Sequence, residues 1–295
     1  MRTGTIASTV CVAFFCLFLS FPAYADTLPD SVDELMGIGS GYTVNKEFKK
    51  AFPYIEKAAT LGHPDAQFML GSMYLRGEGI EKDLSVAMEW FQKSADLNHA
   101  VSQLMVGMGY QIGTGVKIDL DKARKYYELA VKQSEPKAQF YLGSLYAGGK
   151  GVKENNQKAH ELYEKSALQG YDKAQYYVGM QFFEGEGVQK NYSKAQEWIL
   201  KAAEQGYDMA QVQLGKMYNE GLGVKKDFFK ARKWFEKAAE QDNYFGLTYL
   251  ALMYERGEGT RQSYEIAQEL YGQACDRGFQ FACEQYKDLK SRPQR

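Results

Sequence analysis

The chain has 295 residues, 36 Lys and Arg against 37 Asp and Glu, and 45% hydrophobic residues. This near-balance of charge argues against a nucleic-acid or membrane-surface partner, because those surfaces require a clear basic excess or a basic stripe. We therefore expect no nucleic-acid ligand.

Residues 1–25 are typical of a secretory signal peptide. Arg2 gives a positive start, residues 6–21 are mainly apolar, and Ala23-Tyr24-Ala25 forms a small-x-small cleavage site. The apolar run is shorter and more broken than a membrane span requires. We expect cleavage after Ala25, export to the periplasm or beyond, and no membrane span in the mature protein; an uncleaved anchor is the alternative.

From residue 77 onward, Gly-x-Gly pairs recur at a constant interval of 36 residues. The pairs are Gly77/Gly79, Gly113/Gly115, Gly149/Gly151, Gly185/Gly187, Gly221/Gly223 and Gly257/Gly259. Such a period indicates one supersecondary unit copied side by side, stabilised by the stacking of neighbours. A long continuous surface of this kind favours binding over chemistry.

The helix expected before each glycine pair carries a fixed apolar, glycine and aromatic pattern, as in Leu70, Gly71 and Tyr74. Apolar groups at i and i+4 share one helix face. A glycine inside a helix costs roughly 1 kcal/mol, so we expect close approach of the neighbouring backbone there. The Gly-x-Gly pair then ends the helix.

A second helix is expected after each glycine pair. It starts at a column of strong N-cap residues: Asp83, Asp119, Asn155, Asn191, Asp227 and Ser263. Small residues then alternate with bulky ones, as in Ala87, Trp90 and Phe91, which lets stacked helices interdigitate.

The periodicity predicts an all-α solenoid of antiparallel helix pairs over residues 26–290. It comprises a partial cap at about 30–63, six full repeats at about 64–278, a capping helix at 279–290 and a tail at 291–295. Residues 30–45 fit the first-helix columns poorly, whereas the segment after them matches the second helix. This division leaves no room for a separate catalytic domain.

The segment from Ala210 to Trp234 reads Ala-x-x-x-Leu-Gly-x-x-Tyr-x-x-Gly-x-Gly-Val-x-x-Asp-x-x-Lys-Ala-x-x-Trp. It resembles the Sel1-like repeat, a relative of the tetratricopeptide repeat, and the match extends over nearly the whole mature chain. The resemblance implies a right-handed α-solenoid that acts as a scaffold or adaptor for other proteins. Exported bacterial members are associated with envelope assembly, signalling and host contact.

The function expected from this resemblance is non-enzymatic binding of a partner protein or peptide along the concave face. A periplasmic inhibitor or immunity protein, which would block a toxin or an enzyme, is the alternative. A glycan or peptidoglycan ligand is a third hypothesis, weakly supported because Trp90, Trp198 and Trp234 lie in the packing column.

Cys275 and Cys283 are the two cysteines that remain after signal cleavage. An even pair in an exported chain is a disulfide candidate, and two buried thiols are the alternative. The pair is similar to those of cysteine-rich exported family members described from Helicobacter, in which disulfides tie successive helices together. Closing a loop of this length would contribute about 2.5 kcal/mol.

That cysteine-rich group is sometimes described as β-lactam-binding or β-lactamase-like, which makes the Ser-x-x-Lys match at Ser134 and Lys137 relevant. The sequence contains no Lys-Thr-Gly or Ser-Asp-Asn, and Ser134 shares a turn column with Gly170. His63 and His99 also share a turn column, so their spacing reflects repeat ancestry and not metal binding. We expect no catalytic residue, metal or cofactor; the β-lactam hypothesis is the less favoured alternative.

Function is expected on first-helix residues that point roughly 130° away from the core face. We call eight of them the Met/Tyr stripe: Met69, Met105, Met108, Tyr141, Tyr177, Met180, Lys216 and Tyr249. Methionine and tyrosine suit a protein-binding groove, since both offer large contact areas and Met adapts its shape. The alternative is that these side chains pack partly against the neighbouring repeat.

Overall fold

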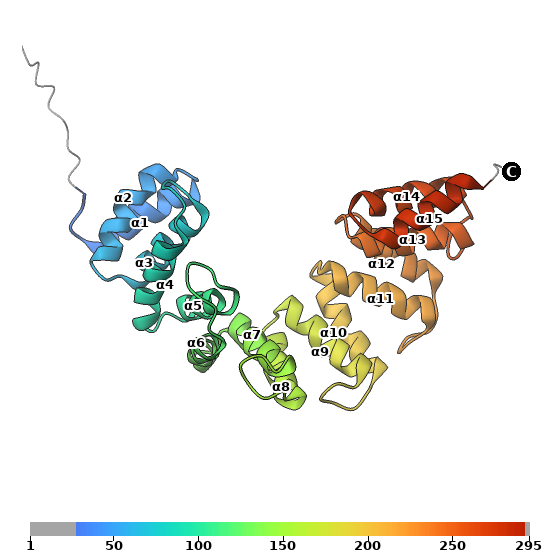
Figure 1. Ribbon diagram of the computed structural model, residues 1–295, viewed down its shortest axis with the longest axis horizontal. Coiled ribbons are helices and arrows are strands. Elements are labelled where there is room, and N and C mark those ends of the chain that lie inside the picture. The colour runs from blue at the N-terminus through green and yellow to red at the C-terminus, as the bar shows by residue number, and fades with distance from the viewer. Residues whose placement is uncertain (1–27, 293–295) are drawn as a thin grey trace, which may run out of the picture.

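The computed structural model describes residues 28–292, which form a curved stack of fifteen helices and contain no strand (Figure 1). The helices are α1 (Val32–Val44), α2 (Phe48–Thr60), α3 (Pro64–Arg76), α4 (Leu84–Asp96), α5 (Ala100–Ile112), α6 (Leu120–Lys132), α7 (Pro136–Ala147), α8 (Asn156–Leu168), α9 (Asp172–Glu184), α10 (Tyr192–Glu204), α11 (Asp208–Glu220), α12 (Phe228–Ala239), α13 (Tyr244–Arg256), α14 (Tyr264–Asp276) and α15 (Gln280–Ser291). The predicted signal peptide lies outside the described residues.

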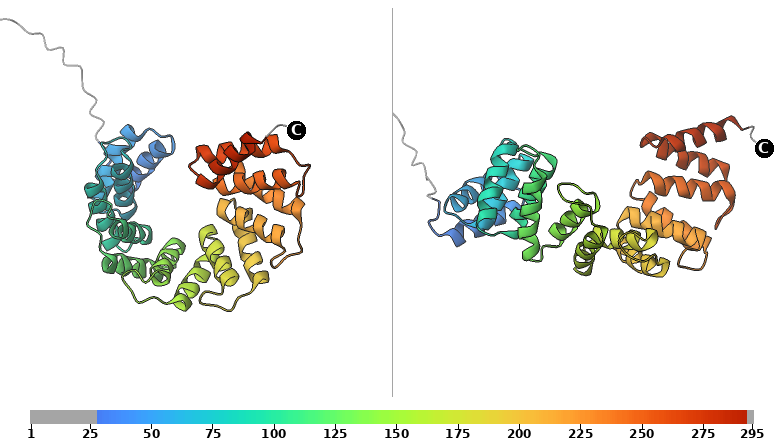
Figure 2. Two further views of the ribbon diagram at one scale, coloured as in Figure 1. Left: turned by 45° about the vertical axis from the view of Figure 1, so that its right-hand side comes forward. Right: turned by 60° about the horizontal axis from the view of Figure 1, so that its bottom comes forward.

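The helices pack in chain order, and the stack bends into an arc with its two ends facing each other across an open centre (Figure 2). Odd-numbered helices α1 to α13 are the first members of each pair (A helices), and even-numbered helices are the second (B helices). Each helix packs mainly against the one before and the one after it. The predicted all-α solenoid of helix pairs is confirmed.

The two glycines of each Gly-x-Gly pair have different tasks. Gly185 ends α9 in the left-handed region at φ 82°, where a residue without a Cβ is favoured. Gly187 also has positive φ, and a Cβ placed on it would lie 2.3 Å from the carbonyl oxygen of Asn156 in the preceding repeat. The first glycine therefore stops the helix, and the second allows neighbouring repeats to touch through their backbones.

The glycine in the packing column of the A helices α1 to α11 makes room mainly for a side chain; α13 has Ala251 there. A Cβ on Gly215 would lie 2.5 Å from the ring of Phe235, and one on Gly71 would lie 2.8 Å from the ring of Phe91 and 3.1 Å from the carbonyl oxygen of Ala87. The expected close backbone approach is thus present, but the nearer contact is the bulky residue of the partner B helix.

The predicted N-cap column is confirmed in all six repeats. Asp83 accepts hydrogen bonds from the backbone N–H groups of Ser85 and Val86, both within 3.0 Å. The equivalent side chains at the other five positions each accept one backbone bond at the start of their helix. Each B helix therefore begins where the sequence pattern places it.

The N-terminal cap at residues 30–63 is a complete helix pair, α1 and α2. Gly39 of α1 packs on Ile55 of α2, just as Gly71 packs on Phe91: a Cβ placed on Gly39 would lie 2.6 Å from the Ile55 side chain. Only residues 45–47 separate α1 from α2, whereas residues 77–83 separate α3 from α4. Because this connector is four residues shorter, the α1 columns fall out of the 36-residue register, and residues 30–45 fit the pattern poorly.

A ladder of glutamines joins the repeats, and the sequence pattern did not identify it. In each of four repeats the amide of a glutamine at the end of the B helix donates to a buried glutamine of the A helix, at 2.8–2.9 Å. The pairs are Gln133 to Gln103, Gln169 to Gln139, Gln205 to Gln175 and Gln241 to Gln211. Three of these acceptors also donate to a carbonyl of the preceding B helix, so the ladder crosses repeat boundaries.

The Leu97→Gln variant is expected to be more stable than the parent by about 1 kcal/mol. Leu97 occupies the donor position of the ladder thirty residues after Gln67, and the Oε1 atom of Gln67 is buried without a hydrogen-bond partner in the described chain. A glutamine there supplies the missing donor. Chemical denaturation measures the gain. The control is Leu168→Gln, which removes an exposed leucine outside the ladder (70% exposed, against 51% for Leu97) and should give none.

Candidate partner-binding surface

All eight residues of the Met/Tyr stripe lie on A helices, from α3 to α13, and none is fully buried. Tyr177 is the most open, with 41% of its surface exposed. In the middle of the arc, α5 and α7 lie on the inner side of α6 and α8 (Figure 1). The structure therefore distributes the stripe along the stack.

The stripe tyrosines rest on buried aromatic rings of the preceding B helix. Tyr141 stacks on Tyr127 with ring centroids 5.8 Å apart, and Tyr249 stacks on Phe235 at 5.0 Å. Lys216 Nζ lies 5.9 Å from the centre of the Tyr249 ring. Each of these tyrosines thus packs partly against a neighbouring repeat, as the alternative interpretation expected, and leaves the rest of its surface exposed.

Two tyrosines outside the predicted stripe enlarge this surface. Tyr171 and Tyr207 occupy the turn column of His63 and His99, precede α9 and α11, and are half-buried. The Tyr207 ring packs edge-on against Tyr176 at 5.3 Å. Their recurrence 36 residues apart was the available signal, but a recurring turn residue looked like part of the scaffold.

Tyr176 and Tyr207 remain protonated at neutral pH. Burial raises the pKa of Tyr176 to about 12, and the neighbouring phenols of Tyr207 and Tyr177 add to the shift. Burial likewise raises the pKa of Tyr207 to about 12. Neutral phenols can donate hydrogen bonds to a partner, but they are poor bases or nucleophiles at this pH.

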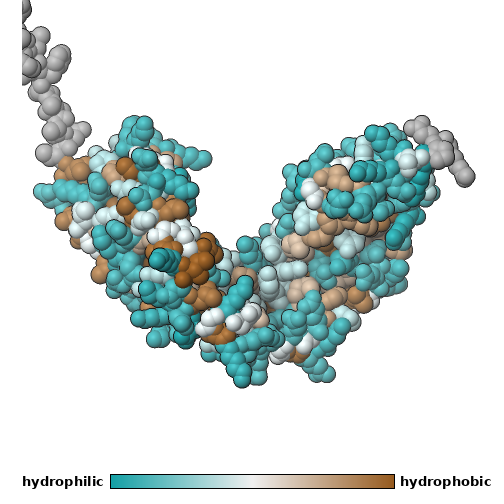
Figure 3. Space-filling view, viewed as in Figure 1, coloured by the Kyte–Doolittle hydropathy of each residue, from teal (hydrophilic) through white to brown (hydrophobic). Residues whose placement is uncertain are grey.

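The N-terminal half of the stripe is more apolar. Val101, Met105, Met108 and Ile112 follow one another along a single face of α5, and Ile112 is 65% exposed. Met105, Met108 and Met88 line a cavity of about 160 Å³ beside this face. Apolar side chains gather at the inner edge of the arc in the N-terminal half (Figure 3), which is a feature of interaction surfaces.

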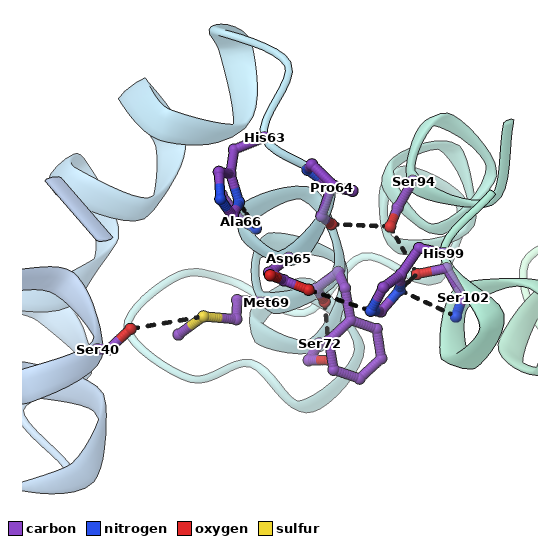
Figure 4. A network of polar contacts seen from close by, with 11 residues as sticks. Ser40, His63, Pro64, Asp65, Ala66, Met69, Ser72, Ser94, His99 and Ser102 are labelled. Carbon is purple, nitrogen blue, oxygen red and sulfur yellow. Dashed lines mark hydrogen bonds and ion pairs between the residues drawn. The ribbon is translucent and has the colours of Figure 1, made fainter. Parts of the chain in front are cut away.

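An aspartate, a histidine and a serine meet where α3, α4 and α5 come together (Figure 4). His99 Nε2 lies 3.2 Å from Asp65 Oδ1, and His99 Nδ1 lies 2.7 Å from Ser102 Oγ. The Ser102 hydroxyl donates to Ser94, which donates to the carbonyl of Pro64. Ser94 and Ser102 are completely buried. A nucleophile must reach its substrate, so this network holds helices together and is no catalytic triad.

The remaining candidates for chemistry have local structural tasks. Ser134 is an exposed turn residue at φ 62°, in the position that Gly170 holds at φ 89° in the next repeat. His63 and His99 accept hydrogen bonds from the backbone N–H groups of Ala66 and Ser102 and so cap α3 and α5. Within residues 28–292 no group of three potential metal ligands comes together.

The predicted disulfide between Cys275 and Cys283 is confirmed. It joins the last turn of α14 to the first turn of α15, with the two Cα atoms 4.6 Å apart. The bond therefore ties the last helix of the stack to its neighbour.

Stacked helix pairs, a packing glycine in the A helices α1 to α11 and six Gly-x-Gly connectors define an α-solenoid repeat protein, a class whose long surface supports a protein-binding role. The Sel1 repeat signature matches residues 35–63, 64–99, 100–135, 136–171, 172–207, 208–243 and 245–279. The chain belongs to the Sel1 repeat family. The match at 35–63 includes the short-connector pair of α1 and α2.

Two solved structures are similar over most of the chain. One is a Sel1 repeat protein from Oxalobacter formigenes, with 31% identity, a TM-score of 0.78, and coverage of 84% of this chain and 100% of that one. The other is c5321, a protective antigen of uropathogenic Escherichia coli, with 31% identity, a TM-score of 0.75 and coverage of 88% of this chain. This chain spans 56% of the length of c5321.

An immunity protein from Pseudomonas aeruginosa is a more distant likeness, with 18% identity, a TM-score of 0.47, and coverage of 77% of this chain and 81% of that one. At this distance the similarity says nothing about function. No curated protein matched the chain. Within residues 28–292 no helix is both long enough and apolar enough to cross a membrane.

Proposed function

We propose that the protein is an exported, non-enzymatic scaffold that binds a partner protein or peptide along the inner face of the solenoid. The observation that carries the proposal is the series of partly exposed tyrosines and methionines that follows the A helices from α3 to α13. Tyrosine and methionine are enriched in protein interfaces, where they combine large contact area with adaptable shape. The disulfide and the signal-peptide pattern support export.

The stacking of the stripe on the core gives it the rigidity that a binding surface needs. Tyr141 and Tyr249 are held by their contacts with Tyr127 and Phe235, so little side-chain entropy is lost when a partner covers them. Rigid, partly desolvated aromatic residues are common hot spots of protein interfaces.

Changing Tyr141, Tyr177 and Tyr249 together to alanine is expected to weaken capture of the partner from envelope extract by at least about tenfold. Quantitative cross-linking followed by mass spectrometry measures the captured amount. Because two of these rings cover core residues, a triple Tyr→Phe variant is made in parallel; it keeps the packing and should retain most of the binding.

The matched control changes three exposed apolar residues outside the stripe, Ile118, Leu168 and Tyr264, to alanine. This control should capture the partner as well as the parent does. Undiminished capture by a folded Tyr→Ala variant would rule out the stripe. A captured toxin or enzyme whose activity is blocked would instead support the role of an inhibitor or immunity protein, which would use the same surface.

A further inference from the structure

A second surface of distinct chemistry lies on the connectors, away from the Met/Tyr stripe. A cleft of about 1000 Å³ opens between the connector from α11 to α12 and the connector from α13 to α14. It is lined by Lys225, Lys226, Lys230 and Arg261, and Asp227 is the one carboxylate among its lining residues. Connectors in the C-terminal half loop out on the outer rim of the arc (Figure 2, left). We call this cleft the rim cleft.

The cations of the rim cleft are available to a ligand. Ion pairs within residues 28–292 involve none of the four. Asp227 is already engaged, since its Oδ1 atom accepts the backbone N–H of Lys230 at the start of α12. Lys226 lies over the ring of Phe228, 4.5 Å from its centre, which fixes the direction of its stem but leaves its charge unneutralised.

Comparison with the sister repeats shows that the scaffold requires neither the Lys225-Lys226 pair nor Phe229. Lys225-Lys226 occupies the second and third positions after a Gly-x-Gly pair, and no other connector has two cations at these positions. The other connectors carry Glu81-Lys82, Lys117-Ile118, Lys153-Glu154, Gln189-Lys190 and Arg261-Gln262. Three residues further on, Phe229 is 65% exposed and also lines the cleft. The equivalent residues are polar: Ser85, Asp121, Gln157, Ser193 and Glu265.

We propose that the rim cleft binds an acidic segment of a partner protein. Its carboxylates would face the four cations, and an apolar side chain of the same segment would cover Phe229. Complementary charge steers such an encounter, and burial of the exposed ring adds apolar contact area. The rim cleft lies apart from the Met/Tyr stripe, so its occupation goes beyond the proposed function and does not depend on it.

The surroundings of the cleft favour a short acidic segment over an extended polyanion. Glu186 occupies the centre of the preceding Gly-x-Gly pair, and Glu258 occupies the centre of the pair that borders the cleft. These carboxylates alternate along the sequence with the cations of the connectors. A nucleic acid or a sulfated polysaccharide binds along a continuous basic stripe, and the four cations do not form one.

The test measures the affinity of a labelled peptide for the purified protein by fluorescence anisotropy. The probe is a peptide of about ten residues made of Glu and Asp with one central Phe; its counterpart replaces every acid by Gln or Asn. The triple variant Lys225→Gln, Lys226→Gln, Arg261→Gln should bind the acidic probe about tenfold more weakly, because three charge contacts worth about twofold each are lost. Phe229→Ser should weaken binding about threefold.

The matched control is Lys117→Gln, Lys153→Gln, Lys190→Gln, which removes three charges that are also exposed and that lie in the same connector columns. Lys190 also lies over an aromatic ring, as Lys226 does. This control should bind the acidic probe within about twofold of the parent.

Three outcomes would overturn the proposal: equal weakening by the control, equal binding of the uncharged peptide, or tighter binding of single-stranded oligothymidylate than of the acidic peptide. The last of these would assign the cleft to a polyanion. Thermal unfolding confirms that every variant is folded. The triple Tyr→Ala variant of the stripe should bind the acidic probe as tightly as the parent does. Binding at the rim cleft can therefore fail or succeed independently of partner binding at the stripe.

Discussion

The Gly187→Ala variant is expected to lose about 3 to 4 kcal/mol of folding stability, the combined cost of a strained backbone and of overpacking. Gly187 has φ +71°, and its built Cβ lies 2.3 Å from the carbonyl oxygen of Asn156 and 2.6 Å from the adjoining carbon. Both are backbone atoms at the start of α8, so no side chain can swing away. The methyl group must push one repeat from the next.

Gly170→Ala separates the two costs. Gly170 has φ +89°, also in the left-handed region, but nothing lies within 4 Å of its built Cβ. This variant should therefore lose only the backbone cost of about 1 to 2 kcal/mol. Chemical denaturation of both proteins measures the difference. Equal losses would mean that the contact of Gly187 with the preceding repeat contributes nothing.

The place of Gly187 in the stack adds a qualitative expectation. In a solenoid each repeat is stabilised by its neighbours, so a lesion between α8 and α10 weakens the coupling of the two halves. Hydrogen exchange should then show the N-terminal and C-terminal helices losing protection at different denaturant concentrations, whereas the parent should lose it more uniformly.

The sequence predicted those parts of the fold that depend on contacts within one repeat. The buried residues of the A helix, the N-caps and the Gly-x-Gly connectors recur because each unit solves the same local problem, and a fixed interval reveals them. The interval fails at α1, where a connector four residues shorter displaces Gly39 from its column although the same packing on Ile55 is kept.

Contacts between repeats were harder to predict, because they depend on how successive units are rotated. The Gln103 amide reaches the carbonyl of Ala95 in the preceding repeat through such a rotation, and nothing in a polar residue of a helix indicates which carbonyl or amide it will reach. Tyr171 and Tyr207 share this difficulty: their column marks a turn, and only the curvature of the stack brings Tyr207 against Tyr176.

The two proposed binding surfaces lie where the repeats differ from one another. The stripe changes from methionine in α3 and α5 to tyrosine in α7 and α13, with both in α9, and the rim cleft depends on the Lys225-Lys226 pair and on Phe229, which the other repeats lack. The contrast between recurring and variable columns therefore distinguishes the residues that build the solenoid from those available for recognition.

Removing the disulfide by the double variant Cys275→Ala, Cys283→Ala is expected to cost about 2.5 kcal/mol, the entropy that cross-linking takes from the unfolded chain. The effect should be concentrated in α15, which packs mainly against α14. Without the bond, α15 is held mainly by buried Ala282 and Leu289. A terminal element with so few contacts frays before the rest of the stack.

Hydrogen exchange followed by mass spectrometry tests this localisation. Amides of α15 should lose most of their protection in the double variant, whereas those of α9 and α10 should be unchanged. Adding a reductant should bring the parent to the same state and leave the double variant unaffected, which separates loss of the bond from loss of the sulfur atoms. Unchanged protection of α15 would mean that its apolar contacts suffice and that the disulfide serves only to close the end of the stack covalently.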